Sequence, residues 1–300
     1  MTGATLSTQD YEAFRIFLEE ACGIVLGENK HYLVASRLGR LMADEGVATL
    51  GDLVGHLRLG SNRILRERIV EAMTTNETFW FRDTYPYDIL KDLILPEFVE
   101  RRVRTPRIWS AACSTGQEPY SISMVVQEYL ASRAGSLGDV QIHATDISPT
   151  ILQEAKDASY DQLALARGLS LERKQKYFAQ LRDNRWQVRP EISKRVRFSQ
   201  TNLLQSYSLL GRFDIIFCRN VLIYFSSECK ADILARMARI LNPGGYLFLG
   251  SSESITQYSD EFEMVRCPRG SVYRVKSDLA NRPTTPSPRP AARVIPGGKR

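Results

Sequence analysis

The sequence predicts an α/β protein built on an open, doubly wound sheet, with an all-α domain before the sheet and a small antiparallel β-subdomain inserted into it. Three observations lead to this fold class. Residues 1–75 show helical periodicity alone, whereas residues 76–276 alternate strand-like apolar runs with helix-like segments. In addition, Arg107–Ser121 combines an apolar start, a run of small residues and a proline, which is typical of a strand, a tight loop and a helix.

The composition is that of an ordinary water-soluble protein and points away from membranes, metals and disulfides. The 300 residues are 43% hydrophobic and 25% charged, enough for one sizeable core and one small extra domain. No apolar run reaches the roughly 18 residues of a membrane span, and the N-terminus lacks an export pattern, so we expect a cytoplasmic protein. The five cysteines form no Cys-x-x-Cys pair and the three histidines are scattered, so the sequence predicts neither a disulfide framework nor a metal site.

The net positive charge of the chain is concentrated at its C-terminus. The segment Ser277–Arg300 holds five basic residues and one acidic residue, which is +4 of the formal +6. It also holds five prolines and few large apolar residues, so it cannot bury enough surface to order itself. We expect residues 277–300 to form a disordered, basic, proline-rich tail, and the remaining +2 gives no argument for a nucleic-acid partner.

The chain begins with a small helical domain. Apolar residues at helical spacing predict four helices, which begin near Thr8, Asn29, Thr49 and Asn62. Thr8 and Asp10 are the candidate caps of the first helix. On the second, Lys30, Arg37 and Arg40 share one face, which is either solvated surface or a contact surface for an acidic partner.

The segment Thr74–Asp83 is unusual because hydrogen-bonding side chains stand next to three consecutive aromatic residues. Asn76, Thr78 and Arg82 alternate with side chains that favour burial, so the segment either plugs a domain junction or lines a pocket. A helix over about 87–101 then leads to the central strand.

The loop after the central strand suits a ligand that carries positive charge or hydroxyl groups. A phosphate-binding loop would show Gly-x-Gly-x-x-Gly or a glycine loop with a lysine, and neither is present. Gly116 stands alone, and Glu118 at the start of the helix would repel a pyrophosphate. S-adenosylmethionine (SAM) has an ammonium, a sulfonium and a ribose but no phosphate, and it fits this loop. The alternative is a plain strand-to-helix turn in which Glu118 only caps the helix.

A second acid, Asp146, follows the next predicted strand, Val140–Thr145. An acid at the end of the second strand of a βαβ unit is placed to accept both hydroxyls of a ribose. Asp146 could instead cap the following helix, Pro149–Ala158, although Ser148 could serve as that cap. The small-residue loop, Glu118 and Asp146 together are a more specific sign of a nucleoside site than any one of them.

A basic segment interrupts the sheet domain. Residues 167–197 hold ten lysines or arginines against three acids, a local charge of +7. Within it, Arg185–Val188 and Val196–Phe198 alternate like short strands around Pro190, so we expect an inserted hairpin over about 177–198. Nucleic acid is a natural partner for such a patch, but its aromatic residues match no base-stacking motif.

The remaining segments complete the predicted sheet. Asn202 lies at the end of a strand within Phe198–Leu204, where an adenine could be read, and a buried strand over Phe213–Asn220 runs into Tyr224. A helix and a turn separate this strand from the last two. The final strand, Ser271–Val275, is expected to pair antiparallel with its neighbour.

Five blocks of sequence, in order and at compatible spacings, resemble one known family. The blocks are Thr75–Arg82, Ser110–Ser121, Ala144–Ser148, Phe217–Phe225 and Asn242–Gly245. They are similar to the SAM-dependent methyltransferases that esterify glutamates on bacterial chemotaxis receptors, and the match runs from about Thr8 to Val275. The resemblance implies a Rossmann-like SAM-methyltransferase sheet, with the helical domain and the inserted subdomain facing the receptor.

The resemblance also implies the cofactor, the partner and the site. The cofactor is SAM, the product is S-adenosylhomocysteine, and the partner is the cytoplasmic helical bundle of methyl-accepting chemotaxis receptors. We expect a monomer that binds no nucleic acid and inserts into no membrane. The residues implied to surround SAM are Asn76, Thr78, Arg82, Glu118, Asp146, Asn202, Leu203, Arg219 and Asn220. Arg82 and Tyr224 are implied to stand near the reacting methyl group.

The chemistry of ester formation agrees with these residues. A glutamate carboxylate is ionised at neutral pH and can attack a sulfonium methyl group without a general base, so no catalytic histidine or cysteine is needed. Some members of the family also bind a peptide at the receptor's C-terminus through a glycine-containing hairpin. Here the corresponding Leu181–Val188 has no glycine, so we predict that this protein works without such a tether.

Two other functions stay open on the sequence alone. A methyltransferase that acts on adenine amino groups would carry Asp/Asn-Pro-Pro-Tyr/Phe after the fourth strand, where this chain has Cys218–Leu222. A protein that uses SAM binding as a sensor, without methyl transfer, has no distinguishing residues, because a sequence does not report turnover.

Overall fold

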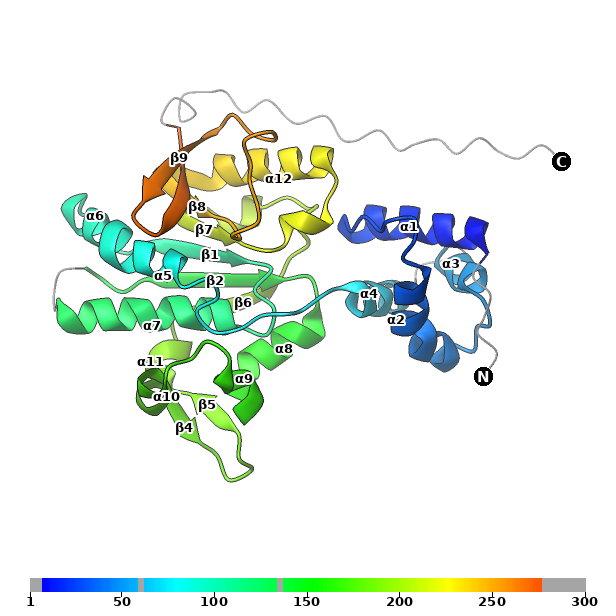
Figure 1. Cartoon of the computed structure of the whole chain (residues 1–300), viewed down its shortest axis with the longest axis horizontal. Helices are drawn as coiled ribbons and strands as arrows, with labels where there is room; N and C mark the ends of the chain where they lie inside the picture. The colour runs from blue at the N-terminus through cyan, green and yellow to red at the C-terminus, as the bar shows by residue number, and fades with distance from the viewer. Residues whose placement is uncertain (1–6, 59–61, 134–136, 277–300) are drawn as a thin grey trace.

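The computed structural model describes residues 7–58, 62–133 and 137–276. The predicted tail, residues 277–300, lies outside these ranges. Within them the chain forms a helical N-terminal domain, a large sheet flanked by helices, and a small second sheet (Figure 1). The predicted fold class, a doubly wound α/β sheet with an all-α domain and an inserted antiparallel subdomain, is confirmed.

The N-terminal domain packs its helices around a separate apolar core. In the described residues these helices are α1 Thr8–Cys22, α2 His31–Asp44, α3 Leu50–Arg58 and α4 Arg63–Met73. The cap of α1 differs from the prediction: Ser7 Oγ accepts the N–H of Asp10 at 3.0 Å, so neither Thr8 nor Asp10 is the cap. Helix α1 ends at Gly23, whose φ of 80° is left-handed and favours glycine.

The main sheet has seven strands in the described part of the chain, in the order β6-β2-β1-β7-β8-β10-β9. The strands are β1 Arg107–Ala111, β2 Gln141–Asp146, β6 Val196–Gln200, β7 Phe213–Cys218, β8 Leu241–Phe248, β9 Phe262–Cys267 and β10 Gly270–Val275. Pairing is parallel from β6 to β8, whereas β10 is antiparallel to β8 and β9, as predicted for the last strand. The strand order reverses between β1 and β7, which opens a crevice at their carboxyl ends.

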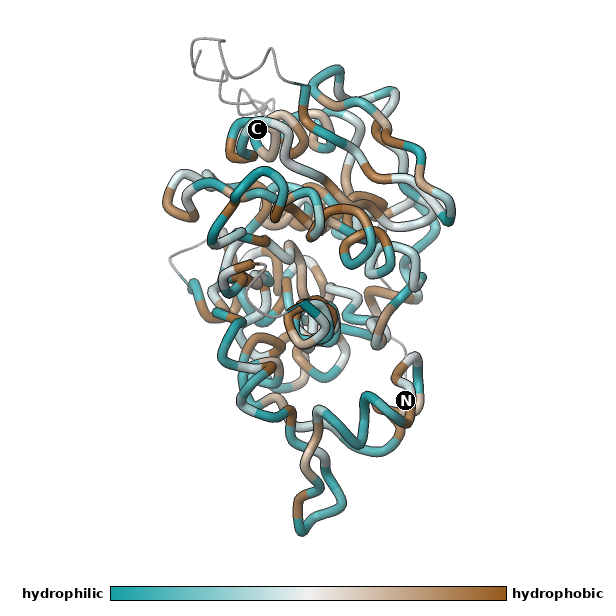
Figure 2. Tube along the Cα trace, turned by 90° about the vertical axis from the view of Figure 1, so that its left-hand side faces the viewer, coloured by the Kyte–Doolittle hydropathy of each residue, from teal (hydrophilic) through white to brown (hydrophobic). Residues whose placement is uncertain are grey.

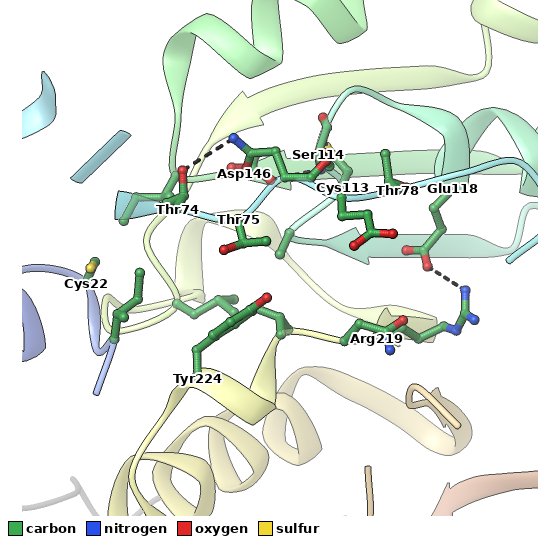
Figure 3. Close-up of a pocket in the computed structure, with 18 of the residues that line it drawn as sticks. Cys22, Thr74, Thr75, Thr78, Cys113, Ser114, Glu118, Asp146, Arg219 and Tyr224 are labelled. Carbon is green, nitrogen blue, oxygen red and sulfur yellow. Dashed lines mark hydrogen bonds and ion pairs between the residues drawn. The ribbon is translucent and has the colours of Figure 1, made fainter. Parts of the chain in front are cut away.

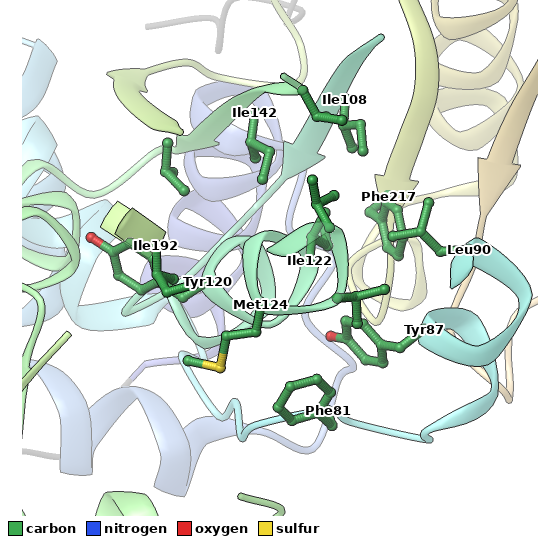
Figure 4. Close-up of a cluster of buried hydrophobic side chains, with 14 of the residues drawn as sticks. Phe81, Tyr87, Leu90, Ile108, Tyr120, Ile122, Met124, Ile142, Ile192 and Phe217 are labelled. Carbon is green, nitrogen blue, oxygen red and sulfur yellow. The ribbon is translucent and has the colours of Figure 1, made fainter. Parts of the chain in front are cut away.

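Helices cover both faces of this sheet. The helical elements are α5 Tyr85–Ile89, the π-helical turn η1 Leu90–Ile94, α6 Leu95–Glu100, α7 Gln117–Ser132, α8 Pro149–Asp157, α12 Ser227–Ile240, and the 3₁₀ turns η2 Ser208–Leu210 and η3 Leu222–Tyr224. Ile122 and Met124 of α7 pack in one core with Ile108, Ile142 and Phe217 of the strands (Figure 4). Side chains of α12 pack in a second core on the opposite face. The two cores fix the sheet, and therefore its carboxyl edge, on a rigid base.

The inserted subdomain differs from the predicted hairpin. Its three-stranded sheet has the order β3-β5-β4, with β3 Ser159–Tyr160, β4 Phe178–Gln180 and β5 Trp186–Val188. Its helices are α9 Gln162–Ala166, α10 Leu171–Tyr177 and α11 Pro190–Ser193. The predicted pairing of residues 185–188 with 196–198 is therefore wrong, because 196–198 belong to β6 and pair in parallel with β2. Alternation of side chains identifies a strand but not its partner. Helix α11, with Ile192 buried, stands between β5 and β6, so the chain has already returned to the main sheet at residue 196.

Hydrophobic segments gather in the sheet and on the adjoining faces of its helices, while the outer turns are mostly hydrophilic (Figure 2). Within residues 7–58, 62–133 and 137–276, no helix is long and apolar enough to cross a membrane. The five cysteines, all described, are free thiols, and no group of three or more potential metal ligands occurs in the described ranges.

Candidate active site

A cleft lies at the carboxyl ends of β1, β2 and β7, and residues of the N-terminal domain and of the segment after α4 complete its lining. Every residue singled out from the sequence lines this cleft: Asn76, Thr78, Arg82, Glu118, Asp146, Asn202, Leu203, Arg219, Asn220 and Tyr224.

The loop between β1 and α7 brings its backbone close to the cleft. Ala112 and Ser114 both adopt positive φ, 57° and 51°, and Gly116 has φ of 93°. A Cβ at Gly116 would lie within 3.2 Å of Tyr120, Tyr160 and Ala155, so this position also needs the small residue for space. The small residues predicted to let a ligand approach are thus held in conformations that larger residues adopt poorly.

Glu118 and Arg219 form an ion pair at one end of the cleft (Figure 3). Arg219 Nη1 lies 3.0 Å from Glu118 Oε2, and Ser110 Oγ donates to Glu118 Oε1 at 2.8 Å. Burial raises the pKa of Glu118 above its usual range, and the Arg219 charge and the Ser110 hydrogen bond limit the rise. The sequence analysis named both residues for the site but did not predict that they pair.

The guanidinium of Arg219 is held by a second acid that the sequence did not indicate. The side chain of Arg219 is 1% exposed, and its Nη2 donates to Asp83 Oδ2 at 2.7 Å. Burial works against the charge of Arg219, but Tyr87, Glu118 and Asp83 outweigh it and raise its pKa. The Nε–H of Arg219 is buried without an acceptor among the described residues.

Asp146 clamps the two loops that border the cleft. Its Oδ2 accepts the N–H of Ser114 at 2.9 Å and its Oδ1 accepts the N–H of Ser148 at 3.1 Å. Burial raises the pKa of the Asp146 carboxyl, and these backbone N–H groups oppose the rise. Ser148, whose Oγ accepts the N–H of Ile151 at 3.1 Å, is the side-chain cap of α8, so Asp146 keeps a lone pair on each oxygen for a hydroxyl donor.

We call Ala112–Ser114, Glu118, Asp146 and Arg219 the sheet wall of the cleft, and Met73–Phe79 the linker wall. The linker wall is held by its backbone: Arg37 donates from Nη1 to the carbonyls of Met73 and Thr74 at 2.6 and 3.0 Å. Arg37 Nη2 also donates to Thr75 Oγ1 at 2.9 Å. Arg37 therefore braces the linker instead of facing an acidic partner with Lys30 and Arg40.

Both readings of the segment Thr74–Asp83 apply, each to one half of it. Its first half lines the cleft, and Ser114 Oγ joins the two walls by donating to the Asn76 carbonyl at 2.9 Å. In its second half, the fully buried Trp80 packs edge-on against Tyr160 and Phe178 of the inserted subdomain, with ring centroids 4.9 and 5.2 Å away. The first part of the segment therefore lines the cleft, and Trp80 in its second part packs between the sheet domain and the inserted subdomain.

Arg82 reaches the cleft from the end of this segment. Its Nη1 donates to the Glu77 carbonyl at 3.1 Å, and its guanidinium lies 5.4 Å from the centre of the Phe79 ring. Arg167 of the inserted subdomain lies 4.2 Å from the same ring centre and pairs with the Glu77 carboxylate at 2.9 Å. Arg82 keeps further N–H groups for another acceptor.

Asn202 is already engaged with the protein. Its Nδ2 donates to the Ala21 carbonyl of α1 at 2.8 Å, and its Oδ1 accepts the N–H of Leu204 at 3.0 Å. The amide thus ties the N-terminal domain to the loop after β6, which leaves less of it for reading an adenine than the sequence indicated. Leu203, beside it, is nearly buried and lines the cleft.

The N-terminal domain supplies cleft residues that sequence reasoning missed. These are Cys22, Ile24 and Met73. The domain docks where the Val25 N–H donates to the Tyr224 carbonyl at 2.9 Å, and where a Cβ on Gly23 would lie 2.4 Å from the Phe225 ring. Burial raises the pKa of Cys22 to about 11, so its thiol is neutral and not a nucleophile.

Comparison with known proteins agrees with this architecture. The family model "CheR methyltransferase, all-alpha domain" matches residues 9–74, and "CheR methyltransferase, SAM binding domain" matches residues 76–271. The "Chemotaxis protein methyltransferase Cher2" of Pseudomonas putida is 54% identical over 269 residues, which cover 89% of this chain and 98% of that protein.

More distant relatives match over a similar length. The "Chemotaxis protein methyltransferase" of Vibrio parahaemolyticus is 52% identical and covers 92% of this chain and 100% of its own. That of Salmonella typhimurium is 34% identical and covers 92% of this chain and 93% of its own. The chain therefore belongs to the CheR methyltransferase family, the SAM-dependent methyltransferases of chemotaxis.

Proposed function

We propose that this enzyme transfers the methyl group of SAM to the side-chain carboxylate of specific glutamates on the cytoplasmic part of chemoreceptors. The product is a glutamate methyl ester. The observation that carries the proposal is the composition of the cleft: the acids Glu118 and Asp146, the cation Arg82 and the phenol Tyr224 belong to one lining, and no histidine is among the residues that line it. Methylation of a carboxylate needs an oriented acceptor and no general base.

The residues of the cleft fit SAM. Glu118 can accept from an ammonium, Asp146 can accept from ribose hydroxyls, and the cationic side chain of Arg219 lies in the same lining as the place proposed for the methionyl group. Asn76, Thr78, Asn202, Leu203 and Asn220 complete the lining. No loop of the cleft offers the glycine-rich anion cradle that a pyrophosphate requires.

The chain's contribution to the reaction is positioning and exclusion of water. Bound SAM supplies an electrophilic methyl group on a sulfonium. Tyr224 and Arg82, both with hydrogen-bond donors in the cleft lining, are the residues we assign to the acceptor carboxylate. When the acceptor carboxylate attacks the sulfonium methyl group, the negative and positive charges neutralise each other. A strong hydrogen bond from Arg82, worth about 1.5 to 3 kcal/mol, would stabilise the ionised carboxylate before the reaction more than in the transition state, and would therefore slow the attack. Arg82 is therefore expected to orient the carboxylate weakly, and its bond to the Glu77 carbonyl is consistent with that restraint.

The test is transfer from SAM carrying a tritiated methyl group to membranes rich in chemoreceptors, followed by base treatment that releases volatile methanol from a methyl ester. Base-labile label on a receptor-sized band, lost in Arg82→Ala, supports the proposal. Arg269→Ala is the matched control, because Arg269 pairs with Asp88 on the surface, at 2.7 Å, and does not line the cleft. Base-stable label on nucleic acid, or SAM binding without transfer, would favour the two alternatives.

A further inference from the structure

The loop from β7 to η3 carries Arg219, Asn220 and Tyr224 into the cleft through a left-handed turn. Asn220 has φ of 57°, in the left-handed region that asparagine tolerates better than most residues but at a cost that glycine does not bear. This turn follows directly after the buried Arg219. If Asn220 relaxed to an extended conformation, the chain on either side would change direction, and Arg219 and Tyr224 could not both keep their places.

A carboxylate behind the loop meets this left-handed turn. Glu253 Oε2 accepts the N–H of Asn220 at 2.7 Å and the N–H of Gly250 at 2.8 Å. Its Oε1 accepts the N–H of Ile223 at 3.3 Å. One side chain therefore ties together the loops that follow β7 and β8, and Glu253 itself is not among the residues that line the cleft.

The close approach of the two loops depends on this clamp. A Cβ at Gly250 would lie 2.5 Å from Asn220 Nδ2 and 2.9 Å from Glu253 Oε2, so a larger residue there would displace these two side chains. Hydrogen bonds from backbone N–H groups to a carboxylate are stronger than neutral ones, and here two of them converge on a single oxygen. If Asn220 left the left-handed conformation, its N–H would turn away from Glu253 and this hydrogen bond would be lost.

We propose that Glu253 is a positioning residue for methyl transfer: it holds Asn220 in the left-handed conformation and so fixes Arg219 and Tyr224 in the cleft. The proposal rests on the proposed function, because it takes this loop to meet both cofactor and acceptor. It makes a graded prediction for side chains at this position. Glutamine keeps one acceptor oxygen but turns an NH₂ group toward an N–H, and alanine leaves all three N–H groups unbound.

The experiment compares Glu253→Ala, Glu253→Gln and the exposed control Glu263→Ala for SAM affinity by calorimetry and for kcat with receptor membranes. We expect kcat to fall about a hundredfold in Glu253→Ala, the loss typical of a misplacement of about 1 Å. SAM affinity should fall much less than kcat. Glutamine should restore part of kcat, and the control should equal the wild type. A kcat unchanged in Glu253→Ala would overturn the proposal.

A second background separates positioning from general loss of stability. Glycine adopts positive φ without strain, so Glu253→Ala should cost less kcat when Asn220 is already glycine. An equal fold-loss in both backgrounds would overturn the proposal. Amide hydrogen exchange of residues 219–224 gives a readout that needs no turnover: faster exchange in Glu253→Ala supports the clamp and unchanged exchange refutes it. Absence of transfer by the wild type would instead refute the proposed function.

Discussion

The sheet wall and the linker wall of the cleft are built in opposite ways. In the sheet wall the functional side chains themselves carry the bonds: Arg219 joins Glu118 to Asp83, and Asp146 binds two backbone N–H groups. In the linker wall, Met73–Phe79, the backbone is held from outside, mainly by the guanidinium of Arg37.

The difference separates stability from ligand binding. Side chains of the sheet wall are buried, so their removal leaves charges or N–H groups without partners and weakens the fold. The linker wall is held by a few partly exposed hydrogen bonds. Loss of these bonds should loosen one side of the cleft while the domains on either side stay folded. Substitutions in the two walls should therefore affect different measurements.

The strongest way to break the sheet wall is Arg219→Ala. Removal of this buried cation leaves Glu118 and Asp83 unpaired, and we expect the free energy of unfolding to fall by about 3 to 5 kcal/mol in a urea titration. Arg219→Lys should lose less, since it keeps the charge but cannot span both carboxylates. A loss below about 1 kcal/mol for alanine would show that the ion pair contributes little to the fold.

The packing of Trp80, which follows the linker wall, can be disturbed by a substitution at Gly168. This residue has φ of 85°, and an added Cβ would lie 1.9 Å from the Trp80 carbonyl oxygen. We expect Gly168→Ala to lower the free energy of unfolding by about 2 to 3 kcal/mol, because the backbone must shift and stay strained. Gly39→Ala, in α2 with nothing within 4 Å of its Cβ, is the matched control and should stabilise the protein by about 0.5 to 1 kcal/mol. Equal effects of the two would contradict the close packing.

The linker wall alone is broken by Arg37→Ala. Loss of three hydrogen bonds to Met73, Thr74 and Thr75 should weaken SAM binding about tenfold, which is about 1.4 kcal/mol. The melting temperature should change little. Calorimetry with SAM checks the affinity, and Arg40→Ala, an exposed arginine of the same helix, is the control. SAM binding of wild-type strength in Arg37→Ala would mean that the linker keeps its shape without this arginine.

The two walls also differ in how far the sequence predicts them. Asp146 ends one predicted strand and Glu118 stands at the start of the helix that follows another, and the carboxyl ends of parallel strands meet at one edge, so their placement in one cleft could be predicted. Cys22 reaches the cleft, and Arg37 reaches the linker that borders it, only because the helical domain docks onto the sheet. No local pattern encodes that docking, so the role of Arg37 as a brace could not be found before the structure.

The wrong pairing in the inserted subdomain has a similar origin, and the structure also changes the argument behind one untested prediction. Alternating residues at 196–198 were expected in the hairpin, but a strand pattern does not specify which sheet it joins. The lack of glycine in Leu181–Val188 was the reason to predict no receptor tether. Asn184 supplies the left-handed turn there, with φ of 60°, so the missing glycine does not prevent a tight hairpin. Calorimetry with a receptor C-terminal peptide tests the tether prediction, and saturable binding would contradict it.

Part of the positive charge of the inserted subdomain is paired with acids of the sheet domain. Arg173 pairs with Glu128 at 2.8 Å and stacks on Phe81, and Arg195 pairs with Asp139 at 2.5 Å. These arginines attach the subdomain to the sheet domain. The local charge of +7 is therefore weaker support for a nucleic-acid partner than the sequence alone indicates.

The smallest expected effect is a dependence of SAM affinity on pH, which sharpens the comparison within the sheet wall. Burial raises the pKa of Glu118, and an ammonium favours its ionised form. Affinity should therefore be constant above the raised pKa and fall as the pH drops through it, by at most about tenfold per pH unit for one proton. Calorimetry from about pH 8 to about pH 5 covers the range above the ordinary pKa of a glutamate, about 4.3, where a raised pKa is expected.

Glu118→Gln distinguishes the two acids of the sheet wall. It removes the titrating group next to Arg219, so its SAM affinity should be lower at neutral pH but less dependent on pH than that of the wild type. The slope that remains belongs to Asp146, whose pKa is also raised by burial and whose oxygens must accept hydrogen bonds to hold a ribose. Identical slopes in the wild type and in Glu118→Gln would assign the whole pH dependence to Asp146 and leave Glu118 as the partner of Arg219 only.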